Sequence, residues 1–319
     1  MEAQLTHYYS KLLLLYLPLL GKAFVLALLL CLAGLPLLAV WGQNLAYSRE
    51  RGAYDKCARQ LGRLGCWLGV VAIIVGCAAL GMQHESLLAL DIKKLASREN
   101  FLPLLMAGGC LCVALSTLLN CLYTGLWQRL RTAPRLHQLL GFLAALAAAA
   151  AVYIALLCLY AHDAALVPPD SAGLRMLFMP DAEDFWAAAS YAPLAALAFA
   201  GGYGALWLLL RRTADDYGRD HYNLAIPWCA GWARNAWLLL WLLVTGRVGW
   251  RVFQLHAAMG GKLDWSQFVP DAAGLAVLLL PGLWWMGISR SAQPLRAKIA
   301  ASLAPLWATG CLLLDMGLR

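Results

Sequence analysis

The stretch V-A-L-S-T-L-L-N-C-L-Y-T-G-L-W-Q-R-L-R-T-A-P-R-L-H, residues 113–137, decides the fold class of this chain. An apolar run ends at Trp127, a short basic segment that contains Pro134 follows, and a second apolar run begins after His137. A helix that leaves a membrane on its cytoplasmic side has this order, because lysine and arginine collect in cytoplasmic loops. The stretch therefore predicts two membrane-spanning helices joined by a short basic loop.

The composition of the whole chain agrees with this prediction. Of its 319 residues, 62% are hydrophobic and 13% are charged, and the mean hydropathy is +0.66. Soluble domains are about half apolar and about a quarter charged, so the sequence predicts an integral membrane protein. The net charge of +8 does not indicate nucleic-acid binding, because the basic residues are spread over short loops between apolar runs.

Eight apolar segments reach the length of about 20 residues that a helix needs to cross a bilayer. They cover roughly residues 13–45, 60–82, 101–127, 137–161, 185–210, 223–246, 268–288 and 295–316. The first is longer than one straight span, and Pro18, Gly21 and Lys22 mark where its outer turns are expected to kink or lie at the interface. We predict an all-α, polytopic membrane bundle of about eight helices that forms one domain over residues 1–319.

The distribution of lysine and arginine predicts how the bundle is oriented. Most of these residues follow the first, third, fifth and seventh segments: Arg49, Arg51, Lys56, Arg59, Arg63, Arg129, Arg131, Arg135, Arg211, Arg212, Arg219, Arg290, Arg296 and Lys298. Fewer fall on the opposite side: Lys11, Lys93, Lys94, Arg98, Arg175, Arg247, Arg251, Lys262 and Arg319. Both termini are therefore predicted to lie on the non-cytoplasmic side.

Small residues predict where the helices approach each other closely, since apolar contact alone does not favour protein over lipid tails. These residues are Gly69, Gly76 and Gly81, the run Ala144–Ala151, and Gly201, Gly202 and Gly204. No Walker A, H-E-x-x-H, G-x-S-x-G or C-x-x-C motif occurs in the sequence. A nucleotide site, a zinc site and a serine nucleophile therefore all lack their signatures, and no metal site is predicted.

Arg234, in the stretch G-W-A-R-N-A-W, is the charge expected deepest in the membrane. It follows Asn223 by a distance of about 17 Å along a helix, and a charge at such depth is a candidate for function. Either Arg234 faces a polar cavity, a lipid or quinone head group or a partner subunit, or it pairs with neighbouring carbonyls. The residues that could hold a quinone or lipid head group are Trp232, Arg234, Asn235 and Trp237.

The histidines bear on haem binding, because a b-type haem takes axial ligands from facing helices. His137 and His221 both fall at cytoplasmic ends of segments and form a pair of matching depth. The others fall at outer ends or in outer loops: His7, His84, His162 and His256. His137 and His221 are thus the candidate haem ligands, and solvated interfacial histidines are the alternative.

Several stretches together resemble a known family. S-T-L-L-N-C-L-Y-T-G-L-W-Q-R-L, residues 116–130, resembles the third helix of cytochrome bd quinol oxidase subunit I. Further stretches look like successive parts of the first five helices of that subunit: L-P-L-L-G near Pro18, Y-D-K-C-A-R-Q-L-G-R-L-G at 54–65, G-G-Y-G-A-L-W from 201, and R-R-T-A-D-D-Y-G-R-D ending at 220. The resemblance covers roughly residues 10–250, and it implies five helices of that type in 1–220 and three more helices in 221–319.

The functional residues of that family do not carry over to this chain. The family has a glutamate immediately before the Ser-Thr pair and another eight residues earlier, where this chain has Leu115 and Ala107. Its haem histidines in the first and fifth helices would fall near Leu13 and Ala195. Its long outward quinol-binding loop is replaced by the short stretch 247–267.

We therefore expect a non-catalytic or haem-free membrane subunit of a respiratory, quinone-linked electron-transfer complex. The resemblance implies the inner membrane of a prokaryote, no cofactor on this chain other than a possible site for quinone, and partner subunits that carry haem or iron-sulfur centres. Two alternatives remain open. One is a haem-b-containing quinol oxidoreductase subunit with displaced ligands, and the other is a transporter built around Arg234 and the broken first helix.

Overall fold

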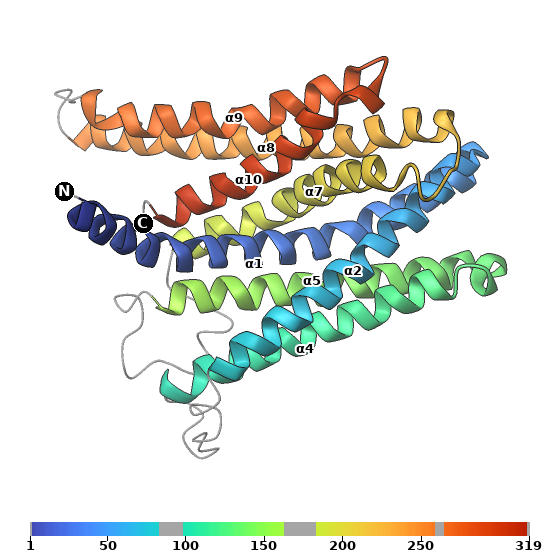
Figure 1. The fold of residues 1–319 in the computed structure, drawn as a ribbon, viewed down its shortest axis with the longest axis horizontal. Coiled ribbons are helices and arrows are strands. Elements are labelled where there is room, and N and C mark those ends of the chain that lie inside the picture. Colours follow the sequence, from blue (N-terminus) through green and yellow to red (C-terminus); the bar gives the residue numbers. More distant parts are fainter. Residues whose placement is uncertain (1, 83–97, 163–182, 259–264, 318–319) are drawn as a thin grey trace. The chain divides into compact units, whose positions relative to one another are not determined.

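The structure, a computed structural model, describes residues 2–82, 98–162, 183–258 and 265–317. Within these ranges the chain forms eight long α helices and three short 3-10 helices, and it holds no strand (Figure 1). The α helices are α1 (Glu2–Arg49), α2 (Gly52–Met82), α4 (Arg98–Gly125), α5 (Pro134–His162), α7 (Glu183–Arg211), α8 (Arg219–Ala258), α9 (Val269–Arg290) and α10 (Lys298–Gly317). The predicted all-α class is confirmed.

Seven of the described helices are long and apolar enough to cross a membrane, namely α1, α2, α4, α5, α7, α8 and α9. The chain is thus a multi-pass membrane protein. The last predicted segment, 295–316, is helical as α10 but is not among the seven, so an eighth span stays a prediction. The orientation of the termini stays a prediction as well.

Three helices extend well beyond the apolar segments that predicted them, and one of them, α2, begins at Gly52 where residue 60 was expected. α1 has 48 residues and is helical on both sides of Pro18, and α8 has 40 residues where only 223–246 was expected. The physical reason is that hydropathy identifies only the apolar part of a helix. Helical hydrogen bonding continues past Arg247 and Arg251, because arginine is a good helix former and no proline occurs from Arg247 to the end of α8.

The chain divides into two compact units. Unit 1 comprises Met1–Ala27 and Gly201–Arg319, and unit 2 comprises Leu28–Ala200. Their boundaries fall inside α1 and α7, so they do not coincide with the division between 220 and 221 that the resemblance implies. The single domain over residues 1–319 stays a prediction.

In unit 2, α4 packs against both α2 and α5. The contact with α2 depends on glycine, because a Cβ at any of four positions would lie closer than 3.0 Å to a side chain of α4. These positions are Gly62, Gly65, Gly69 and Gly76, which face Thr124, Asn120, Thr117 and Cys110 in that order. Gly69 and Gly76 thus lie in close contacts, as predicted, whereas Gly81 has open space where a Cβ would be.

In unit 1, α8 and α9 lie side by side, and α10 packs against α9 (Figure 1). Pro281 lies inside α9 and has no N–H to donate, so the carbonyl of Val277 loses its partner within the helix. The indole N–H of Trp307 on α10 donates to this carbonyl at 3.2 Å. A side chain of one helix thus satisfies the backbone of its neighbour, which matters in a membrane because water is absent.

Candidate functional site

A buried and extensively hydrogen-bonded polar cluster of unit 2 consists of Gln43 on α1, Tyr123 on α4 and His137 on α5. Their exposed fractions are 2%, 0% and 1%. The Nε2 atom of His137 lies 2.6 Å from the carbonyl oxygen of Tyr123, and Nδ1 lies 2.7 Å from Nε2 of Gln43. The hydroxyl of Tyr123 donates to Oε1 of Gln43 at 3.3 Å. Three helices therefore meet at one set of polar side chains.

The hydrogen bonds determine which nitrogen of His137 carries the proton. A carbonyl oxygen can only accept, so Nε2 of the neutral ring must be the N–H that donates to Tyr123. Nδ1 then accepts from the amide of Gln43, which also leaves the amide oxygen of Gln43 to accept from Tyr123. Both ring nitrogens are thus in use.

Aromatic rings hold the imidazole of His137 in this position. The ring stacks on Tyr123 with centroids 4.2 Å apart and an interplanar angle of 9°. The ring of Trp127 meets the imidazole edge-on at 4.8 Å. To bind a haem iron through Nδ1, His137 would have to give up its bond to Gln43, and to bind through Nε2 it would have to lose its bond to Tyr123.

The Ser-Thr pair of the opening stretch bonds to a neighbouring helix of unit 2 and to its own backbone. The hydroxyl of Ser116 donates to the carbonyl of Ala144 on α5 at 2.8 Å. The hydroxyl of Thr117 donates within α4 to the carbonyl of Val113 at 2.7 Å. Leu115, where the resemblance would place a glutamate, has an exposed side chain in unit 2. The pair therefore contributes to helix packing.

Arg234 on α8 makes polar contacts with two side chains of unit 1. Its Nε and Nη2 atoms donate to Oδ1 of Asn235 at 2.9 and 2.8 Å, and Nη1 donates to Oγ of Ser289 on α9 at 3.0 Å. Ser289 is the residue before the last of α9, so the guanidinium lies level with the end of that helix. The depth predicted for Arg234 was measured from Asn223 along α8 alone, and it did not consider that α9 ends beside the guanidinium.

Of the other residues predicted for a head-group site, Asn235 is hydrogen-bonded to Arg234. Trp237 is buried, and its indole N–H donates to the carbonyl of Leu278 on α9 at 2.6 Å. Trp232 precedes Arg234 by two residues, which is about 200° around a helix and so nearly the opposite face of α8. The structure brings Arg234 and Asn235 together and adds Ser289, which the sequence did not suggest.

Of the remaining histidines, His221 was the other candidate haem ligand. His221 on α8 is buried in unit 1, with the rings of Tyr217 and Tyr222 at 5.4 and 4.8 Å from its own. His137 belongs to unit 2, so the pairing of the two histidines stays a prediction. His256 is exposed in the last turn of α8. His84 and the side chains of His7 and His162 lie outside the described residues.

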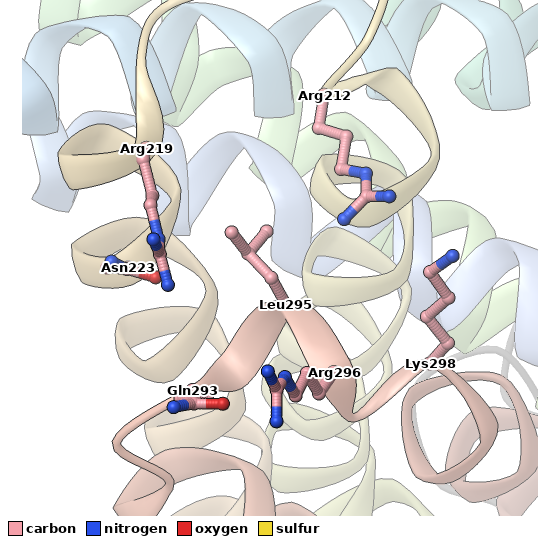
Figure 2. A pocket seen from close by; sticks show the side chains of 7 residues that line it. All are labelled: Arg212, Arg219, Asn223, Gln293, Leu295, Arg296 and Lys298. Atoms are coloured by element: carbon pink, nitrogen blue, oxygen red, sulfur yellow. The ribbon is translucent and has the colours of Figure 1, made fainter.

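A basic pocket of about 450 Å³ lies in unit 1, where the loops after α7 and α9 come together. It is lined by Arg212, Arg219, Asn223, Gln293, Leu295, Arg296 and Lys298, and Figure 2 shows their side chains. In the sequence the four cationic residues indicated only the orientation of the bundle. That two loops separated by two helices would share one pocket was not visible there, although both had been predicted on the same side of the membrane.

No family model matches this chain, and no curated protein matches it. The chemistry of its sites is therefore inferred from its own residues.

Proposed function

We propose that this chain is a haem-free membrane subunit of a respiratory, quinone-linked electron-transfer complex in the inner membrane of a prokaryote. It is a diverged relative of cytochrome bd quinol oxidase subunit I that supplies a scaffold for partners carrying haem or iron-sulfur centres. Both termini face the non-cytoplasmic side.

The observation that carries this proposal is the bonding of His137. This histidine follows the stretch that resembles the family's third helix, and both of its ring nitrogens are engaged by Gln43 and Tyr123. A ligand histidine needs one nitrogen lone pair directed at the metal, while the other nitrogen is held by a second group. Here the protein itself supplies both partners, so the imidazole acts as a connector between three helices.

The Ser-Thr pair supports the same proposal. Ser116 and Thr117 donate their hydroxyl protons to backbone carbonyls of α5 and α4. The neighbouring position, which is acidic in the family, holds Leu115, a side chain that can neither carry a proton nor pair with a cation. These three positions thus have side chains suited to helix packing, and none of the three carries an acid–base group.

A quinone head group, if one is bound, fits best beside Arg234. The guanidinium has five N–H groups, of which three donate to Asn235 and Ser289. The others can donate to a quinone carbonyl, and the exposed amide of Asn235 adds further donors. The proposed role of this cluster is to hold a head group while the tail lies among the apolar side chains of α8 and α9.

Haem content tests the main proposal. The full-length chain is purified from its native membrane together with its partners, then separated from them, and haem is quantified by pyridine haemochrome spectra. We expect haem to remain with the partners and the His137→Leu variant to leave the spectrum of the complex unchanged. A b-type haem that is stoichiometric with the separated chain and is lost in His137→Leu or His221→Leu would favour the alternative of an active oxidoreductase.

Photoaffinity labelling with an azidoquinone tests the head-group site. We expect Arg234→Leu to reduce labelling of the chain, because it removes all five donors, and Arg234→Lys to reduce it less, because it keeps a cationic donor. Equal labelling of the wild type and both variants would remove Arg234 from the proposal and leave the scaffold role untouched.

A further inference from the structure

The basic pocket has a concentration of positive charge that nothing described in the chain neutralises. Arg212 follows α7 directly, Arg219 begins α8, Arg296 ends the 3-10 helix η4 (Pro294–Arg296), and Lys298 begins α10. Figure 2 shows the side chains of Arg212 and Arg219 directed toward Leu295 and Arg296, with Lys298 to one side of them. Within the described ranges none of the four pairs with a carboxylate. Their charges are thus available to a ligand.

The carboxylates of the same loop do not line this pocket. Asp215 is held by the neighbouring Arg211, whose Nη2 lies 3.1 Å from Oδ1 and whose Nε lies 3.3 Å from Oδ2. Asp216 and Asp220 are exposed and are absent from the lining. The charge of Arg211, the last residue of α7, is thus neutralised by a carboxylate. The four cationic residues of the pocket have no such partner among the described residues.

Two helix N-termini add to the positive potential. α8 begins at Arg219 and α10 begins at Lys298, and both residues line the pocket. The first N–H groups of a helix have no partner within the helix, and the helix dipole places partial positive charge there. Helix N-termini with arginine beside them are a common way of binding phosphate. Asn223 and Gln293 contribute neutral donors to the same lining.

An exposed apolar stripe of α10 begins directly beside the pocket. Ile299 follows Lys298 and is 76% exposed, and Leu303, Leu306 and Trp307 continue the exposed face at helical spacing. This stripe extends for about 12 Å along the helix axis. A ligand with a phosphate at one end and a hydrocarbon chain at the other could place its phosphate in the pocket and its chain along the stripe.

We propose that this pocket binds the phosphate group of an anionic membrane phospholipid, whose acyl chain lies along the exposed stripe of α10. A basic pocket between membrane helices at the cytoplasmic surface is the kind of site that such head groups occupy. The proposal is independent of haem and quinone binding, since it uses none of the residues assigned to those roles.

The test uses the full-length chain in a neutral detergent and measures lipid retention by native mass spectrometry and thermal unfolding by tryptophan fluorescence. The lipids are phosphatidylglycerol and cardiolipin, with phosphatidylcholine for comparison, and sodium phosphate and pyrophosphate at matched ionic strength are the soluble probes. We expect the anionic lipids to be retained and to raise the unfolding temperature more than phosphatidylcholine does. Stabilisation by the soluble phosphates without retention of anionic lipid would overturn the proposal.

Variants connect the effect to the pocket. We expect R219Q/R296Q to weaken phosphatidylglycerol binding about 25-fold, since each basic residue near an anionic surface contributes about fivefold. R219K/R296K keeps both charges and is expected to lose less. The matched control is R49Q/R51Q, which removes the same charge from exposed positions at the end of α1 and just before α2. The proposal is overturned if this control loses as much binding as R219Q/R296Q, or if R219Q/R296Q binds like the wild type.

Discussion

The His137 cluster of unit 2 and the basic pocket of unit 1 differ in whether their polar side chains have partners within the described part of the protein. In the cluster, Gln43, Tyr123 and His137 are buried and direct their hydrogen bonds at one another and at the backbone. In the pocket, long cationic side chains converge on a cavity and have no carboxylate partner in the described part of the chain. Buried groups that satisfy each other stabilise a fold, whereas converging charges without partners indicate a ligand.

This comparison predicts that substitutions in the cluster act on stability and that substitutions in the pocket act on binding. The largest effect is expected for His137→Leu. It removes two hydrogen bonds and leaves the amide of Gln43 and the carbonyl of Tyr123 buried without their partner, so the free energy of unfolding should fall by about 3 kcal/mol. The measurement is a denaturant titration in mixed micelles, followed through tryptophan fluorescence.

His256→Leu is the control for this prediction, because His256 is exposed at the end of α8. We expect it to leave the free energy of unfolding within about 0.5 kcal/mol of the wild type, as is usual for surface positions. If both histidine variants unfold like the wild type, the cluster is not a structural connector.

The next largest effect is expected for Gly69→Ala. A Cβ at this position would collide with the side chain of Thr117, so the contact between α2 and α4 must widen. Overpacking of this kind costs about 1–3 kcal/mol. Gly81→Ala provides the comparison on the same helix, because nothing lies within 4 Å of the position that its Cβ would take, and helix propensity should make it neutral or slightly stabilising. A smaller loss for Gly69→Ala than for Gly81→Ala would contradict the packing argument.

A smaller effect is expected for Ser116→Ala. The variant loses a hydrogen bond between α4 and α5, and such bonds in membrane bundles contribute about 0.6–2 kcal/mol. Thr117→Val loses a bond within its own helix, and its cost should be lower. Unfolding titrations of the two single variants decide the order. If Thr117→Val is the more damaging of the two, the Ser-Thr pair has a role other than helix packing.

The smallest effect on stability is expected in the basic pocket. Without anionic lipid, Arg296→Gln should change the free energy of unfolding by less than about 0.5 kcal/mol, since Arg296 is exposed and forms no ion pair with a described residue. Any change should be an increase in the free energy of unfolding, because the substitution relieves repulsion between the cations of the pocket. A loss of stability larger than that of Ser116→Ala would show that the pocket is part of the folded core.

Much of the fold follows from local properties of the sequence. Long apolar runs require helices in a membrane, because every backbone N–H and C=O must be satisfied within its own segment. The eight predicted segments accordingly coincide with eight helices of the described ranges. The ends of α1 and α8 were less predictable, because hydropathy marks where lipid contacts a helix and not where its hydrogen bonding stops.

The candidate sites were only partly predictable, for a related reason. Arg234 was recognisable as a costly charge, but its partner Ser289 lies 55 positions away and carries no signal of its own. His137 was recognisable as an interfacial histidine, yet its role depends on Gln43, which is separated from it by 94 positions. From residue type alone, His137 was a candidate ligand and Arg234 a candidate donor. The side chains that bond to them, Gln43 and Ser289, lie on other helices, so the sequence does not show these pairings.

The sequence by itself determined that this chain is a helical membrane protein and roughly where its helices lie, and it predicts that basic loops cluster on one side. These properties follow from transfer free energies and helix geometry, which act over one segment at a time. The tertiary structure alone decided that α4 packs against the glycines of α2, that His137 connects three helices, and that the four cations line one pocket. Such properties depend on contacts between residues far apart in the chain, and these contacts exist only after the helices have packed.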